Sequence, residues 1–195
     1  MRIGAAFIGF VTALALAAQW KVSTNLMAGA GPIAVLWRML AYFTVLSNLT
    51  ALVLMLNTAI TGHISAKTAG VLTVVMITVG LGYHILLAGI WVPTGLAWWA
   101  DQGLHTAVPI LSVMWWAGFA PKAGLTGRDG LEWLVWPIGY AAYALTRGIN
   151  SGFYPYPFLD LSVLDISRVA LNVAGLGAMF VALALLLIGI ARIIR

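Results

Sequence analysis

Long apolar runs alternate along the chain with short polar breaks, and this pattern predicts six membrane-spanning helices. The runs cover about residues 4–20, 36–60, 69–92, 103–119, 131–147 and 168–190. A helix needs roughly 17–25 mainly apolar residues to cross the hydrocarbon core of a bilayer, and each run reaches that length. Glycine and proline occupy the breaks, where they end helices. We therefore expect an all-α fold, a polytopic membrane protein in which residues 1–195 form a single six-helix transmembrane bundle.

The composition agrees with a membrane location. Hydrophobic residues make up 63% of the chain and charged residues only 8%, whereas a soluble domain is about 45–50% apolar and about 25% charged. The formal net charge is +5, but the basic residues stand singly at the ends of the runs. This distribution favours contact with lipid headgroups and not with nucleic acid. The chain has no cysteine, which excludes disulfides and thiolate metal sites.

The orientation of the bundle follows from its lysine and arginine residues. With the N-terminus in the cytoplasm, the cytoplasmic side holds Arg2, Lys67, Lys122, Arg128, Arg192 and Arg195. The outer side then holds only Lys21, Arg38, Arg147 and Arg168. The positive-inside rule therefore predicts that both termini are cytoplasmic. The first run, with Ala-Leu-Ala-Ala-Gln at 15–19, also resembles a cleavable secretory signal, but its length favours a first transmembrane helix.

Polar side chains gather in the outer half of this bundle. On the second run Thr44, Ser47 and Asn48 lie on one helix face. The other polar groups at this level are Arg38, His84, Asp101, His105, Tyr143, Arg147, Tyr154, Asp160, Arg168 and Asn172. Ionisable groups inside a membrane usually face a bundle interior or a watery cavity, so we expect a functional site here. The alternatives are that the small polar residues only hold helices together and that the arginines reach the headgroups.

A hydroxyl beside an imidazole is the simplest reactive pair among these groups. Thr44 can act as a nucleophile once a base removes its proton, and His105 suits that task because imidazole titrates near neutral pH. Asp101, one helical turn before His105, either fixes the tautomer of the imidazole as a triad carboxylate does or lies solvated among the headgroups. Haem ligation by His84 and His105 is an alternative, since their helices are adjacent.

The remaining polar groups are candidates for binding a substrate. Arg147 and Arg168 have the planar guanidinium that clamps a carboxylate or phosphate. An oxyanion would need a donor, for which Asn48, Tyr154 or an arginine is available. No spaced metal-binding motif, phosphate loop or nucleotide fingerprint is present, so we expect no metal and no cofactor. The residues expected to support the reaction or bind substrate are Arg38, Ser47, Asn48, His84, Asp101, Arg147, Tyr154, Asp160 and Arg168.

Three stretches carry a family resemblance. They are Trp37-Arg38 through Phe43-Thr44 to Asn48-Leu49, the segment Gly103-Leu104-His105-Thr106-Ala107-Val108-Pro109, and Gly139-Tyr140 followed by Tyr156-Pro157-Phe158-Leu159-Asp160. In order and rough spacing they resemble the androgen-induced and androgen-dependent TFPI-regulating proteins. These are six-span membrane enzymes that hydrolyse fatty acid esters of hydroxy fatty acids. The resemblance covers the second to sixth runs, and it implies Thr44 as nucleophile and His105 as base.

The chain also departs from the animal members of that family. They carry Asn-His-Gly where this sequence has Asp101-Gln102-Gly103, they have no counterpart of His84, and their loops are longer. The shorter chain is similar to a bacterial branch of the family, which implies a bacterial cytoplasmic membrane. These differences leave the identity of the substrate open.

The sequence therefore predicts an intramembrane hydrolase of a lipid ester, with Thr44 as nucleophile and His105 as base. Its partners would be a lipid ester or fatty-acyl substrate and the surrounding membrane lipids, and nothing in the sequence indicates an oligomeric state. The alternative is a membrane protein that binds or transports a lipid or small molecule without chemistry. Broken helices near the midplane and inverted repeats would favour transport, and neither is clear in the sequence.

Overall fold

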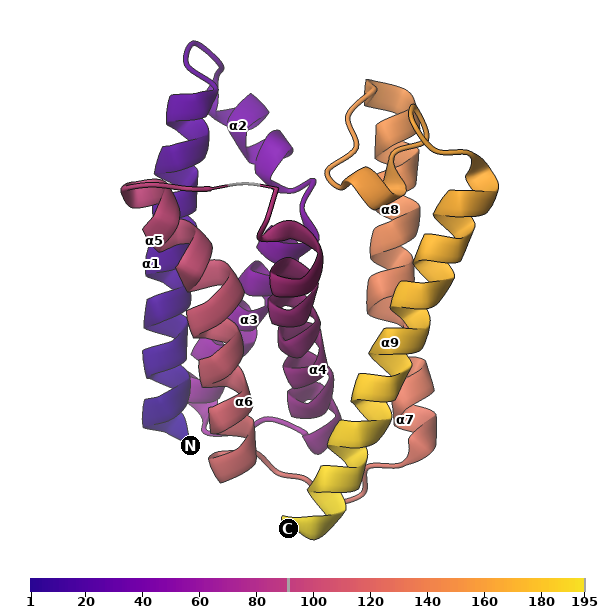
Figure 1. Cartoon of the computed structure of the whole chain (residues 1–195). Helices are drawn as coiled ribbons and strands as arrows, with labels where there is room; N and C mark the ends of the chain where they lie inside the picture. The colour runs from indigo at the N-terminus through magenta and orange to yellow at the C-terminus, as the bar shows by residue number, and fades with distance from the viewer. Residues whose placement is uncertain (91, 195) are drawn as a thin grey trace.

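The fold was analysed in a computed structural model, which describes residues 1–90 and 92–194, and it is all-α (Figure 1). The elements in chain order are α1 Arg2–Leu26, α2 Pro32–Met39, α3 Phe43–Thr61, α4 Ala66–Gly82, η1 Tyr83–Leu87, α5 Leu96–Gln102, η2 Gly103–Ala107, α6 Val108–Phe119, α7 Gly127–Glu132, α8 Val135–Ser151, η3 Pro157–Leu159 and α9 Ile166–Ile193. Both termini lie at the lower end of the bundle in Figure 1, and α2 and residues 152–165 form the upper end.

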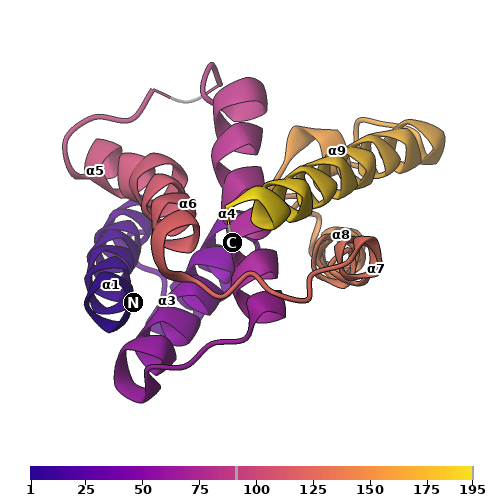
Figure 2. The same ribbon diagram turned by 90° about the horizontal axis from the view of Figure 1, so that it is seen from below.

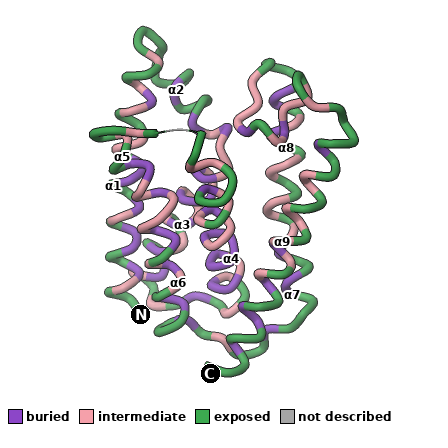
Figure 3. Tube along the Cα trace, viewed as in Figure 1, coloured by how far each residue is buried: buried purple, intermediate pink, exposed green. Residues whose placement is uncertain are grey.

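Four helices of the described chain are long and apolar enough to cross a membrane. They are Arg2–Leu26, Phe43–Thr61, Ala66–Leu87 and Ile166–Ile193. Their outward faces carry large exposed apolar side chains, among them Phe10, Val53 and Leu186. Figure 3 shows the exposed residues on the outside of the helices and the buried ones between them. Length, composition and this exposed apolar surface together indicate an integral, multi-pass membrane protein.

The long central helices meet in one apolar core. Met55 of α3, Met76 of α4 and Phe180 of α9 are fully buried and belong to the same cluster. Seen along the bundle, α1, α5 and α6 lie on one side of α3 and α4, and α8 and α9 lie on the other (Figure 2). Two smaller clusters cover the upper end, one between α1, α2 and α3 and one between α8, α9 and η3. Leu104 of η2 belongs to the first of these clusters and Tyr156 to the second.

The predicted span over 36–60 is divided in the structure, and this is the main correction to the predicted elements. A turn at residues 40–42 separates α2 from α3, and Tyr42 has the extended conformation of a residue that precedes a helix. The carbonyls of Leu40 and Ala41 accept hydrogen bonds from the hydroxyls of Tyr143 and Tyr140 in α8. Because α8 supplies these donors, the chain can leave the helix here without unsatisfied carbonyls.

Other boundaries also differ from the prediction. The run predicted over 103–119 begins earlier, because α5, η2 and α6 form one continuous helix from Leu96 to Phe119. The run over 131–147 is divided into α7 and α8, and the run over 69–92 ends its helix at Leu87. The runs over 4–20 and 168–190 are both longer as α1 and α9.

Two π-helical turns interrupt the helices on either side of the site. In η1 the amide of Ala88 bonds to the carbonyl of Tyr83, and in η2 the amide of Val108 bonds to that of Gly103, each five residues back. Pro109 explains the second turn, because it lacks the N–H that would bond to the carbonyl of His105 and its ring crowds that carbonyl. Such wide turns occur frequently at functional sites.

Candidate active site

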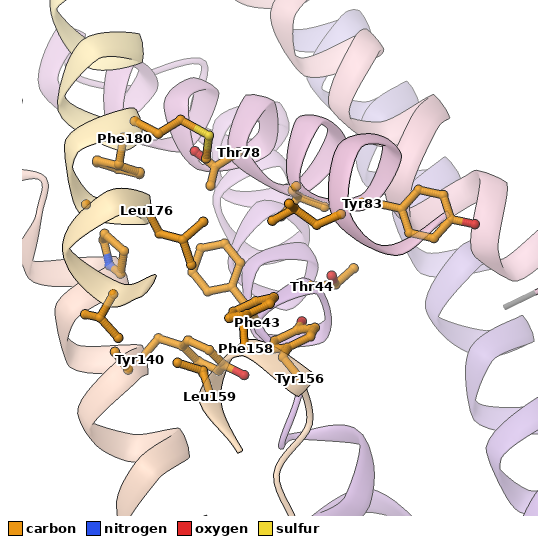
Figure 4. Close-up of a pocket in the computed structure, with 18 of the residues that line it drawn as sticks. Phe43, Thr44, Thr78, Tyr83, Tyr140, Tyr156, Phe158, Leu159, Leu176 and Phe180 are labelled. Carbon is orange, nitrogen blue, oxygen red and sulfur yellow. The ribbon is translucent and has the colours of Figure 1, made fainter. Parts of the chain in front are cut away.

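Two cavities open beside Thr44. The larger measures about 540 Å³ and is lined by polar groups that include Arg38, Asp101 and His105, together with apolar residues of α1 and α2. The smaller measures about 110 Å³ and lies between α4, α8, α9 and η3, with an almost wholly apolar lining (Figure 4). Thr44 and Tyr156 border both cavities. A bound molecule with one apolar and one more polar part would therefore place its middle near Thr44.

The broken helix sets the position of Thr44. Because α3 begins at Phe43, Thr44 lies in its first turn, where backbone N–H groups have no carbonyl partner within the helix. One turn further on, the side-chain amide of Asn48 donates to the carbonyl of Thr44 at 2.9 Å and to that of Leu104 at 3.3 Å. Asn48 is fully buried and thus ties the start of α3 to η2.

His105 faces Thr44 from η2. Its Nε2 lies 3.2 Å from Oγ1 of Thr44. Its Nδ1 lies 3.2 Å from Oδ1 of Asp101 and 3.1 Å from the carbonyl oxygen of the same residue. Both oxygens of Asp101 can only accept, so Nδ1 carries the hydrogen and the neutral ring presents the lone pair of Nε2 to the hydroxyl of Thr44. In this tautomer the imidazole can accept a proton from Thr44.

Asp101 is buried and receives hydrogen bonds from neutral groups. The hydroxyl of Tyr83 donates to Oδ2 at 2.6 Å, and the amide of Gln102 donates to the same oxygen at 3.3 Å. The ring of Tyr83 also stacks on the imidazole of His105, with 4.1 Å between the ring centroids. Tyr83 thus fixes both the carboxylate and the base.

Tyr156 approaches Thr44 from the other side, out of the loop between α8 and α9 (Figure 4). Its side chain is buried among Tyr42, Tyr140 and Phe158. Burial raises the pKa of Tyr156, while the nearby hydroxyl and backbone N–H of Thr44 act in the opposite direction. The phenol is therefore held in its neutral form beside the hydroxyl of Thr44.

The structure brings part of the predicted set together and places the rest elsewhere. Thr44, His105, Asp101 and Asn48 form one hydrogen-bonded group. Arg38 lines the larger cavity, with its guanidinium 3.4 Å from the centroid of the Phe153 ring. Ser47 accepts a hydrogen bond from Trp136 and faces α8 instead of the site.

Four other residues of the prediction lie outside both cavities, namely Arg147, Tyr154, Asp160 and Arg168. Arg147 is buried, stacks on Trp37 and donates to Tyr143. Tyr154 packs against Gly148, which leaves no room for a Cβ atom there. Asp160 bonds to Ser162, and Arg168 is exposed with its backbone N–H on the Asp165 side chain. These residues shape the upper end without bordering either cavity.

Sequence reasoning missed three residues of this site, which are Tyr83, Gln102 and Tyr156. Tyr83 directly precedes His84 and Gln102 directly follows Asp101, and both His84 and Asp101 belong to the predicted site residues. Tyr156 stood in the aromatic segment of the family resemblance but without an assigned role. Only the fold shows that Tyr83 and Gln102 contact Asp101 and that Tyr156 lies beside Thr44.

Metal ligation finds no support in the arrangement of the side chains. No group of three or more histidine, cysteine, aspartate or glutamate residues converges within residues 1–90 and 92–194. The Nε2 atoms of His84 and His105, which haem ligation would need, each lie at hydrogen-bond distance from a threonine hydroxyl. Haem binding would have to break both contacts.

Comparison with known proteins adds no relative, because no protein-family model, no curated protein and no solved structure matches this chain. The family resemblance stated above therefore stays a prediction that rests on the three quoted stretches. The class of protein that the fold and the side chains define is a multi-pass membrane protein with a partly buried threonine–histidine–aspartate series.

Proposed function

We propose that this protein is an intramembrane lipid-ester hydrolase with Thr44 as nucleophile. The observation that carries the proposal is the hydrogen-bonded series from Thr44 through His105 to Asp101, at the point where two cavities of different polarity adjoin. A nucleophile, a base and an orienting carboxylate in this order are the parts of a hydrolytic triad. In this proposal the chain crosses a bacterial cytoplasmic membrane six times, with both termini in the cytoplasm.

The reaction proceeds in two halves. Thr44 Oγ1 attacks the carbonyl carbon of the ester as its proton passes to Nε2 of His105. The tetrahedral intermediate collapses, the C–O bond to the alcohol breaks, and His105 returns the proton to the leaving oxygen. Water then attacks the acyl-threonine ester, gives a proton to the same Nε2, and releases the carboxylic acid as Thr44 regains its hydrogen.

The oxyanion of each tetrahedral intermediate needs donors that are already in place. The backbone N–H groups in the first turn of α3 have no carbonyl partner within the helix, and those of Phe43 and Thr44 face the phenol oxygen of Tyr156, which an oxyanion would have to displace. The neutral hydroxyl of Tyr156 adds a second donor from the opposite side. Asn48 cannot serve in this way without breaking its bonds to the carbonyls of Thr44 and Leu104.

The two cavities accommodate different parts of the substrate. An acyl chain fits the smaller, apolar cavity, where Leu176 and Phe180 of α9 form part of the wall (Figure 4). The alcohol part then occupies the larger cavity, whose polar groups include Arg38 and Gln19. Fatty acid esters of hydroxy fatty acids are substrates of this kind, in keeping with the family resemblance.

Covalent labelling tests the proposal directly. Purified protein in detergent is treated with a fluorophosphonate probe, and wild type is compared with Thr44→Ala, His105→Ala and Thr44→Ser. Thr50→Ala is the matched control, because Thr50 lies on the same helix and its hydroxyl donates to the carbonyl of Leu46, away from the site. We expect labelling of wild type, Thr44→Ser and Thr50→Ala, and loss of labelling in the other two variants.

Two results would reject the hydrolase. One is labelling of folded Thr44→Ala at the rate of wild type, which would place the activated hydroxyl elsewhere. The other is a folded wild type that neither accepts the probe nor hydrolyses p-nitrophenyl octanoate. The second result would favour a protein that binds or transports a lipid without chemistry.

A further inference from the structure

His84 has no part in the mechanism above, yet a continuous series of hydrogen bonds joins it to the aspartate. Its Nε2 lies 3.0 Å from Oγ1 of Thr106. The same hydroxyl lies 2.9 Å from Oε1 of Gln102, and the amide nitrogen of Gln102 lies 3.3 Å from Oδ2 of Asp101. Three contacts thus lead from an exposed imidazole to a buried carboxylate.

The direction of each hydrogen bond follows from the carboxylate. Ionised Asp101 can only accept, so the NH₂ group of Gln102 must face it, and the carbonyl oxygen of Gln102 must face Thr106. The hydroxyl of Thr106 then donates its single hydrogen to Gln102, and its oxygen can only accept from His84. His84 must therefore carry a hydrogen on Nε2. All donors in the series point toward Asp101.

This arrangement prevents the amide of Gln102 from turning over. Turned over, Gln102 would place its oxygen against the carboxylate of Asp101 and its NH₂ against the hydroxyl of Thr106. That alternative is unfavourable because two acceptors would face each other at Asp101, and because the hydroxyl of Thr106, accepting from both Gln102 and His84, would lose the acceptor of its own hydrogen. A fixed Gln102 in turn fixes the rotation of Asp101, and this rotation sets the tautomer and angle of His105.

We propose that His84 is a positioning residue, which holds the carboxylate of Asp101 toward His105 through Thr106 and Gln102. The proposal rests on the hydrolase for its catalytic consequence, although the series itself can be measured without activity. His84 is exposed, so its side chain can be replaced without opening a cavity in the core. The titratable groups around His84 are Tyr83, which packs edge-on against its ring, and Asp101 and His105 across the series.

A double-mutant cycle tests whether His84 acts through Gln102. The turnover of p-nitrophenyl octanoate is measured for His84→Ala, for Gln102→Leu and for the double variant. We expect each single change to lower kcat about threefold to tenfold with KM unchanged, and the double variant to be no slower than Gln102→Leu alone. Effects that multiply in the double variant would overturn the proposal, as would a kcat of wild-type size in His84→Ala.

Conservative variants separate positioning from bulk packing. In His84→Gln a side-chain amide can still donate to Thr106 but cannot titrate. We expect it to keep more than half of the wild-type kcat with KM unchanged, whereas His84→Ala loses rate. Thr106→Ser should keep the rate and Thr106→Val should match His84→Ala. His63→Gln is the matched control, because His63 lies at the far end of α3 and contacts Thr61.

Nitrogen NMR of histidine-labelled protein tests the series without substrate. We expect a hydrogen on Nε2 of His84 and on Nδ1 of His105, and a change in the nitrogen signals of His105 in Gln102→Leu and His84→Ala but not in His63→Gln. If the nitrogen signals of His105 were the same in wild type and in both Gln102→Leu and His84→Ala, the proposal would be overturned even in an active enzyme. Coupled changes of these signals in a protein without hydrolysis would instead keep the series and reject only the hydrolase.

Discussion

Replacing Asp101 with asparagine should remove most of the activity, because the neighbouring donors would orient the new amide against the base. Tyr83 and Gln102 both donate to Oδ2 of Asp101, so the oxygen of the new side-chain amide would remain at that position. Its NH₂ group would then take the place of Oδ1, 3.2 Å from Nδ1 of His105. Two donors facing each other repel, so the tautomer with its hydrogen on Nε2, which cannot accept the proton of Thr44, gains population over the one whose Nδ1–H bonds to the backbone carbonyl of residue 101 alone.

The size of the loss follows from the role of the tautomer. In a serine triad the same substitution lowers kcat by about 10⁴ because the base holds the wrong tautomer. The contacts here are longer than ideal, and we expect a loss of about 10²–10⁴, which corresponds to about 2.7–5.4 kcal/mol of transition-state stabilisation. The assay is the rate of fluorophosphonate labelling together with the turnover of p-nitrophenyl octanoate.

The control for this prediction is Asp160→Asn. Asp160 lies in the loop of the upper end, and its side chain bonds only to Ser162 among the described residues. It should label at the wild-type rate. If Asp101→Asn, folded to the same melting temperature, retained more than half of the wild-type labelling rate, the tautomer argument would be refuted.

Three further predictions concern the oxyanion, the packing of η2 and the lower end of the bundle. Tyr156→Phe should lower kcat roughly 100-fold with little change in melting temperature if its hydroxyl is an oxyanion donor, and an unchanged kcat would remove it from the mechanism. Gly103→Ala should cost about 1–3 kcal/mol and much of the activity, because its Cβ would lie 2.7 Å from the Cβ of Ala15. Gly118→Ala is the control and should behave as wild type, because no atom lies within 4 Å of its new Cβ and Gly118 borders neither cavity. Asp129 pairs with Lys67 at 2.5 Å, and this hydrogen-bonded contact lowers the pKa of Asp129 below its ordinary value of 3.8. The stability that the pair contributes should therefore be present above pH 3.8 and be lost as the pH falls through the lowered pKa. The melting temperature of wild type should fall over this acidic range, and Asp129→Asn should lack this part of the pH dependence.

The helices themselves could be predicted from the sequence because each depends on a local apolar run. The run over 168–190 appears as α9, and the only difference is a few residues at each end. The break at 40–42 could not be predicted, since Leu40-Ala41-Tyr42 contains neither glycine nor proline. Its freed carbonyls are satisfied by tyrosines about one hundred residues further along the chain, and no local pattern reveals such a partner.

The same distinction applies to the site. The contact between Thr44 and His105 was predictable, because polar side chains at the same depth of an apolar bundle face its interior and pair with one another. The contact between Asp101 and His105 followed from their spacing of one turn, although a solvated Asp101 was the alternative. Tyr83 and Tyr156 were missed because a tyrosine near a membrane surface is usually an interfacial anchor, and only the π-helical turn and the aromatic loop direct these two inward.

The charges around Asp101 support a catalytic and not merely a structural carboxylate. A buried carboxylate that only stabilises a fold is usually matched by a fixed cation. Within the described residues no lysine or arginine nitrogen lies within 4 Å of Asp101, whose partners are a phenol, an amide and His105. The carboxylate therefore gains a full opposite charge only when His105 takes up a proton. In the proposed reaction that event is the attack of Thr44, so the electrostatic attraction is greatest in the transition state and not in the resting protein, as catalysis requires.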